Sequence, residues 1–336
     1  MTRLSLRALL PMALFLASGA ASAQFLPSYG GDRAGTSGFQ FLEVAVDPRG
    51  AALGGTAVAT ADDASSLFWN PALAARGGNT QVGLAQLAYY ADVSMTYGAV
   101  TRKVGPFALG AHVQALDSGE MDVTDEFSGP AGTGQTFSYV GIVGGLTVSQ
   151  ALTDLFAYGV TAKFVRESAA DVAMDAALVD LGVHYKVGTT GANIGIAIRN
   201  FGLNGVASGN LPRTTVGGET VAEDEFEDLV PPTTFLLGMS YDVMRGAGDH
   251  ALTVSGQLTN PNDNSEQFNL GTEYVFADLL AVRAGYAFGV EEADLPTFGF
   301  GVNVPGLGNR TVRADYGFAQ LNRLGTAHRI GVTASF

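Results

Sequence analysis

The chain of 336 residues contains no cysteine, and its 18 lysine and arginine residues are outnumbered by 32 aspartate and glutamate residues. Without cysteine, a disulfide framework and any thiolate-based metal or redox site are excluded. The formal net charge of −14 argues against binding to nucleic acid, because like charges repel. We expect no nucleic-acid partner, no bound metal and no cofactor.

Long apolar runs are also missing beyond the first residues, so no membrane-spanning helix of about 20 residues is predicted. Residues 1–23 read as a cleaved signal peptide. Arg3 and Arg7 precede the apolar run ALLPMALFLASGA, and the small residues ASA end the segment. We therefore expect an exported protein whose mature chain begins at Gln24.

Most of the remaining chain alternates apolar and polar residues. In the final stretch, TAHRIGVTASF, Ile330 and Val332 face one way while Arg329 and Gly331 face the other. The same alternation runs through DLGVHYKV, LLAVRAGYAFG and TVRADYGF. A period of two residues indicates β-strands with one apolar face.

Turn signals divide residues 80–336 into fourteen predicted strands. Most are longer than the roughly 5 to 6 residues of an ordinary globular strand, and they match the 9 to 11 or so of a tilted strand that crosses a bilayer. The expected ranges are 80–91, 93–103, 105–117, 135–149, 155–167, 177–188, 191–201, 233–244, 249–260, 265–277, 279–290, 296–305, 310–320 and 326–336.

The links between these strands largely alternate in length, although the turn at Ala91-Asp92 is short where a long loop is expected. This pattern predicts an all-β fold, a 14-stranded antiparallel transmembrane barrel of the bacterial outer membrane. The 45 glycines fit the inner face of curved strands. A soluble antiparallel sandwich or solenoid is the alternative. The short turns are at 103–105, 187–191 and 276–278, and the longer links are at 118–134, 168–176, 202–232 and 291–295.

Residues 24–79 do not alternate. A short helix is expected at 63–69, with Asp62 or Asp63 as its cap. The helix should break at Asn70-Pro71, because proline restrains the residue before it. A segment of this size ahead of a wide barrel is expected to fold into the lumen as a plug.

The run FQFLEVAVDPRGAALGGTAVATADDASSLFWNPALA resembles the N-terminal signature of the PorV/PorQ-type outer-membrane family. That family belongs to the FadL-like transport barrels, so the resemblance implies fourteen strands and an N-terminal hatch in the lumen. Asn70-Pro71-Ala72-Leu73 lacks the glycine of N-P-A-G-L, and Asp47-Pro48 stands where small residues are usual. The residues that carry the signature are Phe39, Phe41, Leu42, Arg49, Gly54, Gly55, Asp62, Asp63, Trp69, Asn70 and Pro71.

The resemblance implies a non-enzymatic accessory of type IX protein secretion, which binds exported cargo or secretion components. The alternative is a FadL-like uptake channel, in which a hydrophobic small molecule binds in the lumen and leaves sideways when the hatch shifts. Outer-membrane lipid and the barrel assembly machinery are further expected partners. The terminal Phe336 resembles the signal by which outer-membrane barrels are inserted.

Charged residues on the predicted inner face are candidate lumen residues. We expect them, apart from Asp180 and His184 and together with Asp242, to form a salt-bridged network around the plug that involves Asp47, Arg49 and Asp62 or Asp63, with a substrate-selecting ring as the alternative. They are Lys163, Asp180, His184, Arg199, Glu273, Arg283, Arg313, Asp315 and Arg329.

Two further hypotheses are weaker. His112 and His184 could serve a hydrolase with Asp180, but G-x-S-x-G, HExxH and P-loop motifs are missing, and ordinary polar lumen residues are the simpler interpretation. The acidic loop 219–228 is interpreted as solvated charge. A divalent-cation or protein-docking site is its alternative, although the spacing matches no calcium loop.

Overall fold

A computed structural model describes residues 33–124, 132–214, 220–223, 226–244, 248–290, 295–305 and 310–336. The predicted signal peptide at 1–23 and Gln24 lie outside these residues. Within these ranges, no helix is both long and apolar enough to cross a membrane.

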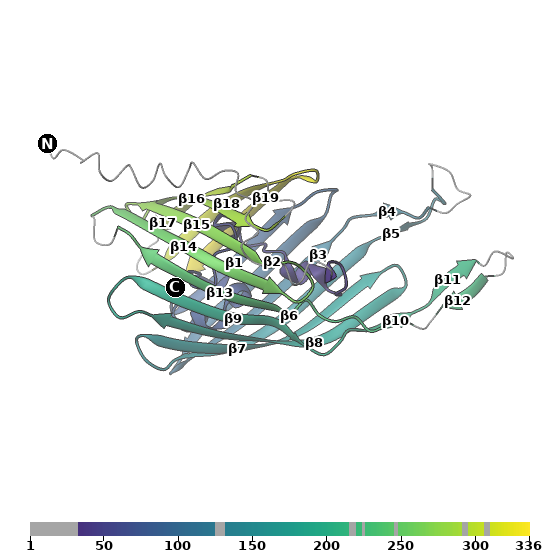
Figure 1. The fold of residues 1–336 in the computed structure, drawn as a ribbon, viewed down its shortest axis with the longest axis horizontal. Helices are drawn as coiled ribbons and strands as arrows, with labels where there is room; N and C mark the ends of the chain where they lie inside the picture. Colours follow the sequence, from purple (N-terminus) through teal and green to yellow (C-terminus); the bar gives the residue numbers. More distant parts are fainter. Residues whose placement is uncertain are drawn as a thin grey trace.

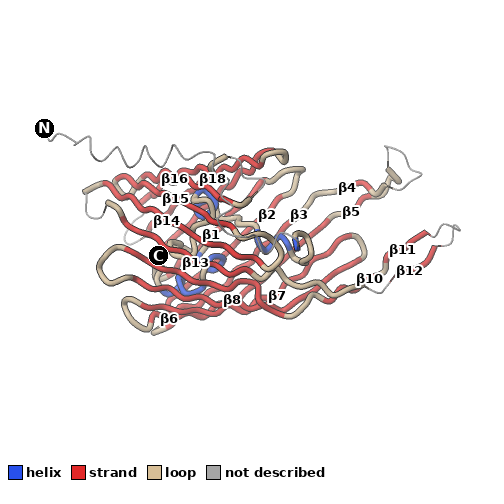
Figure 2. The backbone as a smooth tube through the Cα atoms, in the orientation of Figure 1, coloured by secondary structure: helices blue, strands red, loops and turns tan. Residues whose placement is uncertain are grey.

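Fourteen antiparallel strands form a closed ring (Figures 1 and 2). The ring closes where β1 pairs with β19, and the Phe336 amide donates to the Thr80 carbonyl at 2.9 Å. The all-β, 14-stranded prediction is thus confirmed, and each predicted range overlaps one strand. The strands are β1 (Thr80–Ala88), β2 (Ser94–Val104), β3 (Phe107–Asp117), β6 (Tyr139–Ala151), β7 (Phe156–Ala169), β8 (Val172–Lys186), β9 (Ala192–Gly202), β13 (Thr234–Asp242), β14 (His250–Pro261), β15 (Gln267–Phe276), β16 (Leu280–Phe288), β17 (Thr297–Pro305), β18 (Thr311–Leu321) and β19 (Gly325–Ser335).

The outer face of the ring is apolar. Along β7, buried and exposed residues alternate strictly from Ala157 to Arg166. A strand that crosses lipid needs this arrangement, with apolar side chains outward and polar side chains toward the lumen. Exposed apolar side chains include Leu84, Val100, Leu109, Ile142, Leu146, Phe164, Leu181, Met239, Val282, Phe300, Ile330 and Val332.

The two ends of the ring differ. The short-turn end carries the turns 105–106, 187–191 and 277–279 and both ends of the barrel sequence, whereas the long-loop end carries the links 118–138 and 203–233. Short additional strands extend these two links beyond the ring (Figure 1) and were not predicted. They are β4 (Met121–Asp122), β5 (Thr136–Phe137), β10 (Val206–Gly209), β11 (Leu211–Thr214) and β12 (Thr220–Glu223).

The acidic loop falls partly in this region. Glu219, Asp224 and Glu225 lie outside the described residues, and the backbone of Thr220–Glu223 pairs with β11 as a short hairpin. The role of the loop stays a prediction.

The expected long link at 168–176 is wrong. β7 and β8 instead continue into a tight turn at Ala170 and Asp171, where Ala170 has a φ of 49°. Asp171 is the only favoured turn residue at this position, so the sequence carried only a weak signal for so tight a turn.

Residues 33–79, called here the N-terminal segment, hold the described helices. They are η2 (Gln40–Glu43), α2 (Pro48–Ala52), α3 (Ser66–Trp69) and η3 (Pro71–Ala75). The Asp47 carboxylate caps α2 by accepting from the amides of Arg49 at 3.3 Å and Gly50 at 2.6 Å.

The helix expected at 63–69 is shorter than predicted. It begins at Ser66 after Ser65, with no side-chain cap. Asp63 accepts from the Ser65 amide at 2.7 Å, and an arginine of the barrel also donates to its carboxylate. The break at Asn70-Pro71 lies where predicted, and Asn70 caps η3 by accepting from the Ala72 amide at 3.1 Å.

Candidate functional site in the barrel interior

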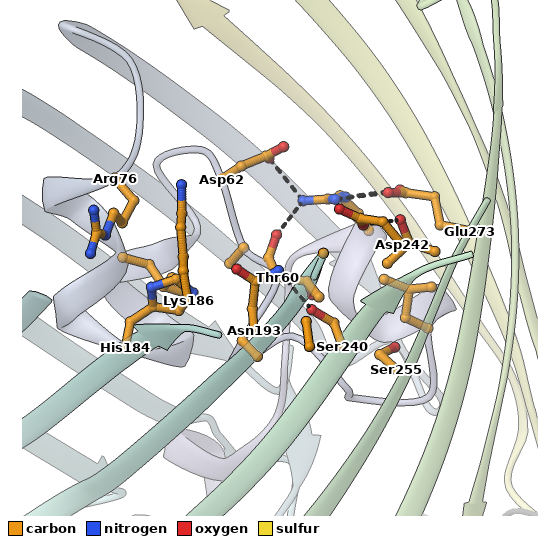
Figure 3. Close-up of a pocket in the computed structure, with 18 of the residues that line it drawn as sticks. Thr60, Asp62, Arg76, His184, Lys186, Asn193, Ser240, Asp242, Ser255 and Glu273 are labelled. Atoms are coloured by element: carbon orange, nitrogen blue, oxygen red, sulfur yellow. Dashed lines mark hydrogen bonds and ion pairs between the residues drawn. The ribbon is translucent and has the colours of Figure 1, made fainter. Parts of the chain in front are cut away.

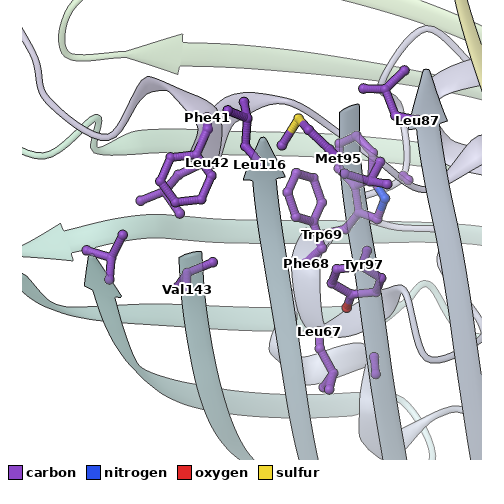
Figure 4. Close-up of a cluster of buried hydrophobic side chains, with 14 of the residues drawn as sticks. Phe41, Leu42, Leu67, Phe68, Trp69, Leu87, Met95, Tyr97, Leu116 and Val143 are labelled. Atoms are coloured by element: carbon purple, nitrogen blue, oxygen red, sulfur yellow. The ribbon is translucent and has the colours of Figure 1, made fainter. Parts of the chain in front are cut away.

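The N-terminal segment packs against the inner face of the ring on opposite sides. Helix α2 contacts β16, β17, β18 and β19, whereas η3 contacts β3, β6, β7 and β8. Apolar side chains of the segment join those of β1, β2, β3 and β6 in one buried cluster (Figure 4). At its centre, Leu67 and Trp69 are 0% and 4% exposed.

Glycines on the inner face allow this close approach. A β-carbon at Gly182 would lie 2.1 Å from the Asn70 Oδ1 atom, and one at Gly159 would lie 2.6 Å from the Pro71 carbonyl carbon. On the opposite wall, a β-carbon at Gly285 would lie 2.1 Å from the Gly54 amide nitrogen. The segment therefore sits where the strands have no side chains.

Asn70 connects the segment to the barrel wall. Its side chain is 0% exposed. The Nδ2 group donates to the carbonyls of Val58 at 2.9 Å and Val183 at 3.0 Å, while Oδ1 accepts from Ala72. The polar groups of this buried amide are therefore paired with backbone, as burial requires.

A chain of ion pairs links α2 to β15, β16 and β18. Arg49 binds Asp62 at 2.8 Å and Glu273 at 2.8 Å (Figure 3). Arg283 then joins Glu273 at 2.5 Å to Asp315 at 2.6 Å. Because all but Asp62 are largely buried, the charges are compensated inside the barrel rather than by solvent.

Arg313 extends the same chain back to the N-terminal segment. Its Nε atom donates to Asp315 at 2.7 Å, and its guanidinium also pairs with Asp63 and, at 3.3 Å, with Asp62. Both carboxylates of the acidic pair are thus held by barrel arginines. The structure brings together seven of the predicted network residues here, including both Asp62 and Asp63, whereas Asp47 caps α2 and accepts from the Trp69 indole at 3.2 Å.

Lys163 and Asp180 form a separate buried pair in the wall between β7, β8 and β9. Asn200, with a φ of 56°, bulges opposite them, and the β8–β9 register shifts between Val179 and Leu181. The Asn200 amide donates to Asp180 at 2.7 Å, and its side chain accepts from Lys163 at 3.0 Å. The Lys163–Asp180 pair therefore supplies hydrogen-bond partners for the polar groups of Asn200 at the bulge.

Two other predicted arginines bind carbonyls of the N-terminal segment. Arg199 donates to Leu42 at 2.9 Å and lies 3.8 Å above the Phe68 ring centroid. Arg329 donates to Ala45 at 2.8 Å. Both side chains hold the segment in place rather than line an open pore.

The histidines of the hydrolase hypothesis point inward but are not assembled with a nucleophile. His112 stacks on Tyr97, with ring centroids 6.0 Å apart, and His184 lies elsewhere along the wall. Asp180 is engaged by Lys163 and Asn200. In the described ranges, no hydrogen bond joins a serine hydroxyl to either histidine. Asp242 accepts from a threonine at 3.0 Å and stands apart from the network.

Several interior residues were missed by the sequence analysis. Gln114 donates to the Phe41 carbonyl at 3.0 Å, and Gln257 accepts from the Val58 amide at 3.2 Å. Asp263, 2% exposed, accepts from Gln40 at 2.5 Å. Gln114 and Gln257 occupy inward positions of strands whose residues alternate between the two faces. The alternation therefore marks them as interior residues, although neither carries a charge.

Two cavities adjoin in the half of the interior nearer the long-loop end. An outer cavity of about 660 Å³ opens at the long-loop end, and a central cavity of about 240 Å³ lies deeper in the barrel, beside Trp69. Both are lined by Glu43, Ala45, Gln267 and Arg329, so they adjoin. The outer cavity carries an aromatic and aliphatic wall that consists of Phe41, Val44, Tyr89, Tyr90, Val93, Leu116 and Tyr139.

The fold is similar to that of solved hydrocarbon channels. The toluene transporter TodX of Pseudomonas putida aligns with a TM-score of 0.60 at 12% identity, over 85% of this chain and 96% of that one. The toluene transporter TbuX of Ralstonia pickettii gives 0.57 at 16% identity, over 86% and 96%. The monoaromatic hydrocarbon channel CymD gives 0.56 at 14%, over 87% and 98%.

Comparisons of sequence alone gave no such likeness. No family model matches the chain, and no curated protein matches it. These findings establish a FadL-like fold and do not support the PorV/PorQ-type family in particular, which stays a hypothesis together with its role in type IX secretion.

Proposed function

We propose that this protein is an outer-membrane uptake channel for a hydrophobic small molecule. The observation that carries the proposal is the outer cavity, because its aromatic and aliphatic wall stands open at the long-loop end of the barrel. Apolar pockets of a few hundred cubic ångströms with a few polar groups are typical of small-molecule sites. The likeness to toluene transporters supports the same class of solute.

In this proposal the solute leaves the aqueous phase at Tyr89, Tyr90 and Tyr139 and moves into the central cavity beside Trp69. The N-terminal segment blocks further passage as a plug. Thr56 and Val58 hydrogen-bond to Ser255 and Gln257 of β14, and no lining residue is common to the central cavity and the polar cavity at the short-turn end. Release then requires the segment to shift.

The single tryptophan provides the test. Trp69 is the only indole of the chain and lines the central cavity. We expect titration of the purified barrel with toluene to change Trp69 fluorescence saturably, while Trp69→Phe loses the signal. An unchanged spectrum up to the solubility limit of toluene would count against the proposal.

The secretion hypothesis makes a different prediction. An accessory of type IX secretion should co-purify with secreted proteins, and its deletion should reduce their export. Export that is unchanged in a deletion strain, together with toluene binding, would leave uptake as the function.

A further inference from the structure

A third cavity lies at the opposite end of the barrel from the aromatic wall. It has a volume of about 400 Å³ and is lined by Gly188 and Gly191 of the turn 187–191, so it opens at the short-turn end. Its walls are mainly polar, and they come from the N-terminal segment and from β8, β9, β13, β14 and β15 (Figure 3). Arg49, Asp62 and Glu273 of the interior network line one part of the cavity, and its other polar residues belong neither to that network nor to the outer cavity.

One wall carries two cationic side chains that form no ion pair among the residues described, together with a histidine. Arg76, His184 and Lys186 lie on one side of the cavity in Figure 3. Arg76 donates through Nη1 to the Asp154 carbonyl at 2.8 Å, but its buried Nε and Nη2 atoms have no hydrogen-bond partner. Neither Arg76 nor Lys186 forms an ion pair with any residue that the structure describes.

His184 adds an orphaned nitrogen to the same wall. Its side chain is 3% exposed and lines the cavity, yet its Nδ1 atom has no partner. Buried polar atoms without partners are rare in proteins, because each costs roughly 1 to 3 kcal/mol relative to a hydrogen-bonded group. The two unpartnered N–H groups of Arg76 indicate that a ligand supplies the missing acceptor, and His184 adds a further polar atom beside them.

The facing wall carries hydrogen-bond acceptors and an unpaired carboxylate. Asp242 accepts only from the Thr253 hydroxyl among the residues described, and Asn193 and Ser240 lie between it and Lys186. β8 and β13 flank β9, so the two walls are about 10 Å apart at the usual strand spacing. Lys186 and Asp242 form no ion pair in the structure, and a small molecule can span the space between them.

We propose that this cavity binds a small organic acid whose oxyanion group is held by Arg76 and Lys186, and whose hydroxyl or ammonium donor faces Asp242. A guanidinium with two free N–H groups suits a carboxylate or phosphate oxygen pair. The site faces the compartment at the short-turn end. Binding of a ligand at this site does not depend on whether the protein is an uptake channel.

Binding of lactate to the purified full-length barrel tests this site, with neutral lactamide and inorganic phosphate as comparison probes. We expect Arg76→Gln and Lys186→Gln each to weaken lactate binding at least about tenfold, because each removes a charge-assisted hydrogen bond. Lys103→Gln is the matched control. It removes the same charge at an exposed position of the same end, outside the cavity lining.

Each outcome decides between specific binding in the cavity and unspecific attraction to a positive charge. Lactate binding that fails in both cavity variants but survives in Lys103→Gln supports the site, and phosphate competition would show that any oxyanion suffices. Lys186 is exposed and unpaired, so its variant tests binding even if Arg76→Gln misfolds. No binding of lactate or phosphate by the wild type would overturn the proposal. An equal loss in Lys103→Gln would do the same, since it would indicate unspecific attraction.

Discussion

Replacing Gly182 by alanine should displace the N-terminal segment from the barrel wall. The added β-carbon would lie 2.1 Å from Asn70 Oδ1 and 2.8 Å from the Pro71 Cδ atom. Neither neighbour can yield easily, because Asn70 is held by three hydrogen bonds and Pro71 starts η3.

The size of the effect follows from two contributions. Overpacking of a buried site costs about 1 to 3 kcal/mol, and leaving the partners of the Asn70 amide unsatisfied costs a further 1 to 3 or so. We expect a loss of about 4 kcal/mol in the free energy of unfolding, or release of the segment with the barrel intact. Either outcome should raise the ion conductance of the protein in planar bilayers.

Gly144→Ala is the matched control, because it makes the same change in β6 where nothing lies within 4 Å of the new β-carbon. Thermal unfolding in detergent and single-channel conductance should both be near wild type for this variant. The reasoning is refuted if Gly182→Ala matches Gly144→Ala in both assays. The position of the N-terminal segment would then not depend on the missing side chain at Gly182.

Three further predictions concern charge and assembly. Glu273→Gln should destabilise the barrel by about 3 kcal/mol in chemical denaturation, since it leaves buried guanidinium groups uncompensated, whereas Arg166→Gln in an exposed pair should cost below about 1. Burial, together with the nearby Asp263 carboxylate, raises the pKa of Glu43 to about 7. Stability should therefore be greatest below pH 4.5 and fall by at most about 3 kcal/mol as the pH rises through 7, a dependence that Glu43→Gln should remove in pH-resolved melting curves. Deleting Phe336 should reduce the amount of heat-modifiable barrel in outer-membrane fractions, whereas Phe336→Tyr should retain it.

The ring of strands could be predicted because burial on one face imposes a period of two on every strand. The run Ile330 to Ser335 carries this period without interruption, and β19 lies there. The hairpin at Ala170 was predicted as a link that is too long, because a positive φ at alanine leaves no mark in the sequence. The projecting strands β4, β5, β11 and β12 are too short to show any period.

The interior was predictable in composition but not in pairing. The alternation put Arg283, Glu273 and Asp315 on the inner face, yet the pairing of Arg283 with both carboxylates depends on strand order and tilt. The contact of Asn70 with the Val183 carbonyl joins residues 113 positions apart, which no local pattern encodes. The outer cavity was also hidden, since Phe41, Tyr89 and Tyr139 come from three separate elements.

Toluene uptake by cells that produce the barrel tests the central claim most directly. Val93→Arg places a cation in the wall of the outer cavity, whereas Glu120→Arg adds the same side chain at an exposed position of the same end, outside the lining. We predict that radiolabelled toluene accumulates faster with wild type and Glu120→Arg than with cells lacking the protein, and that Val93→Arg reduces the rate to that background. Uptake that is the same in all four strains would contradict a hydrophobic uptake channel.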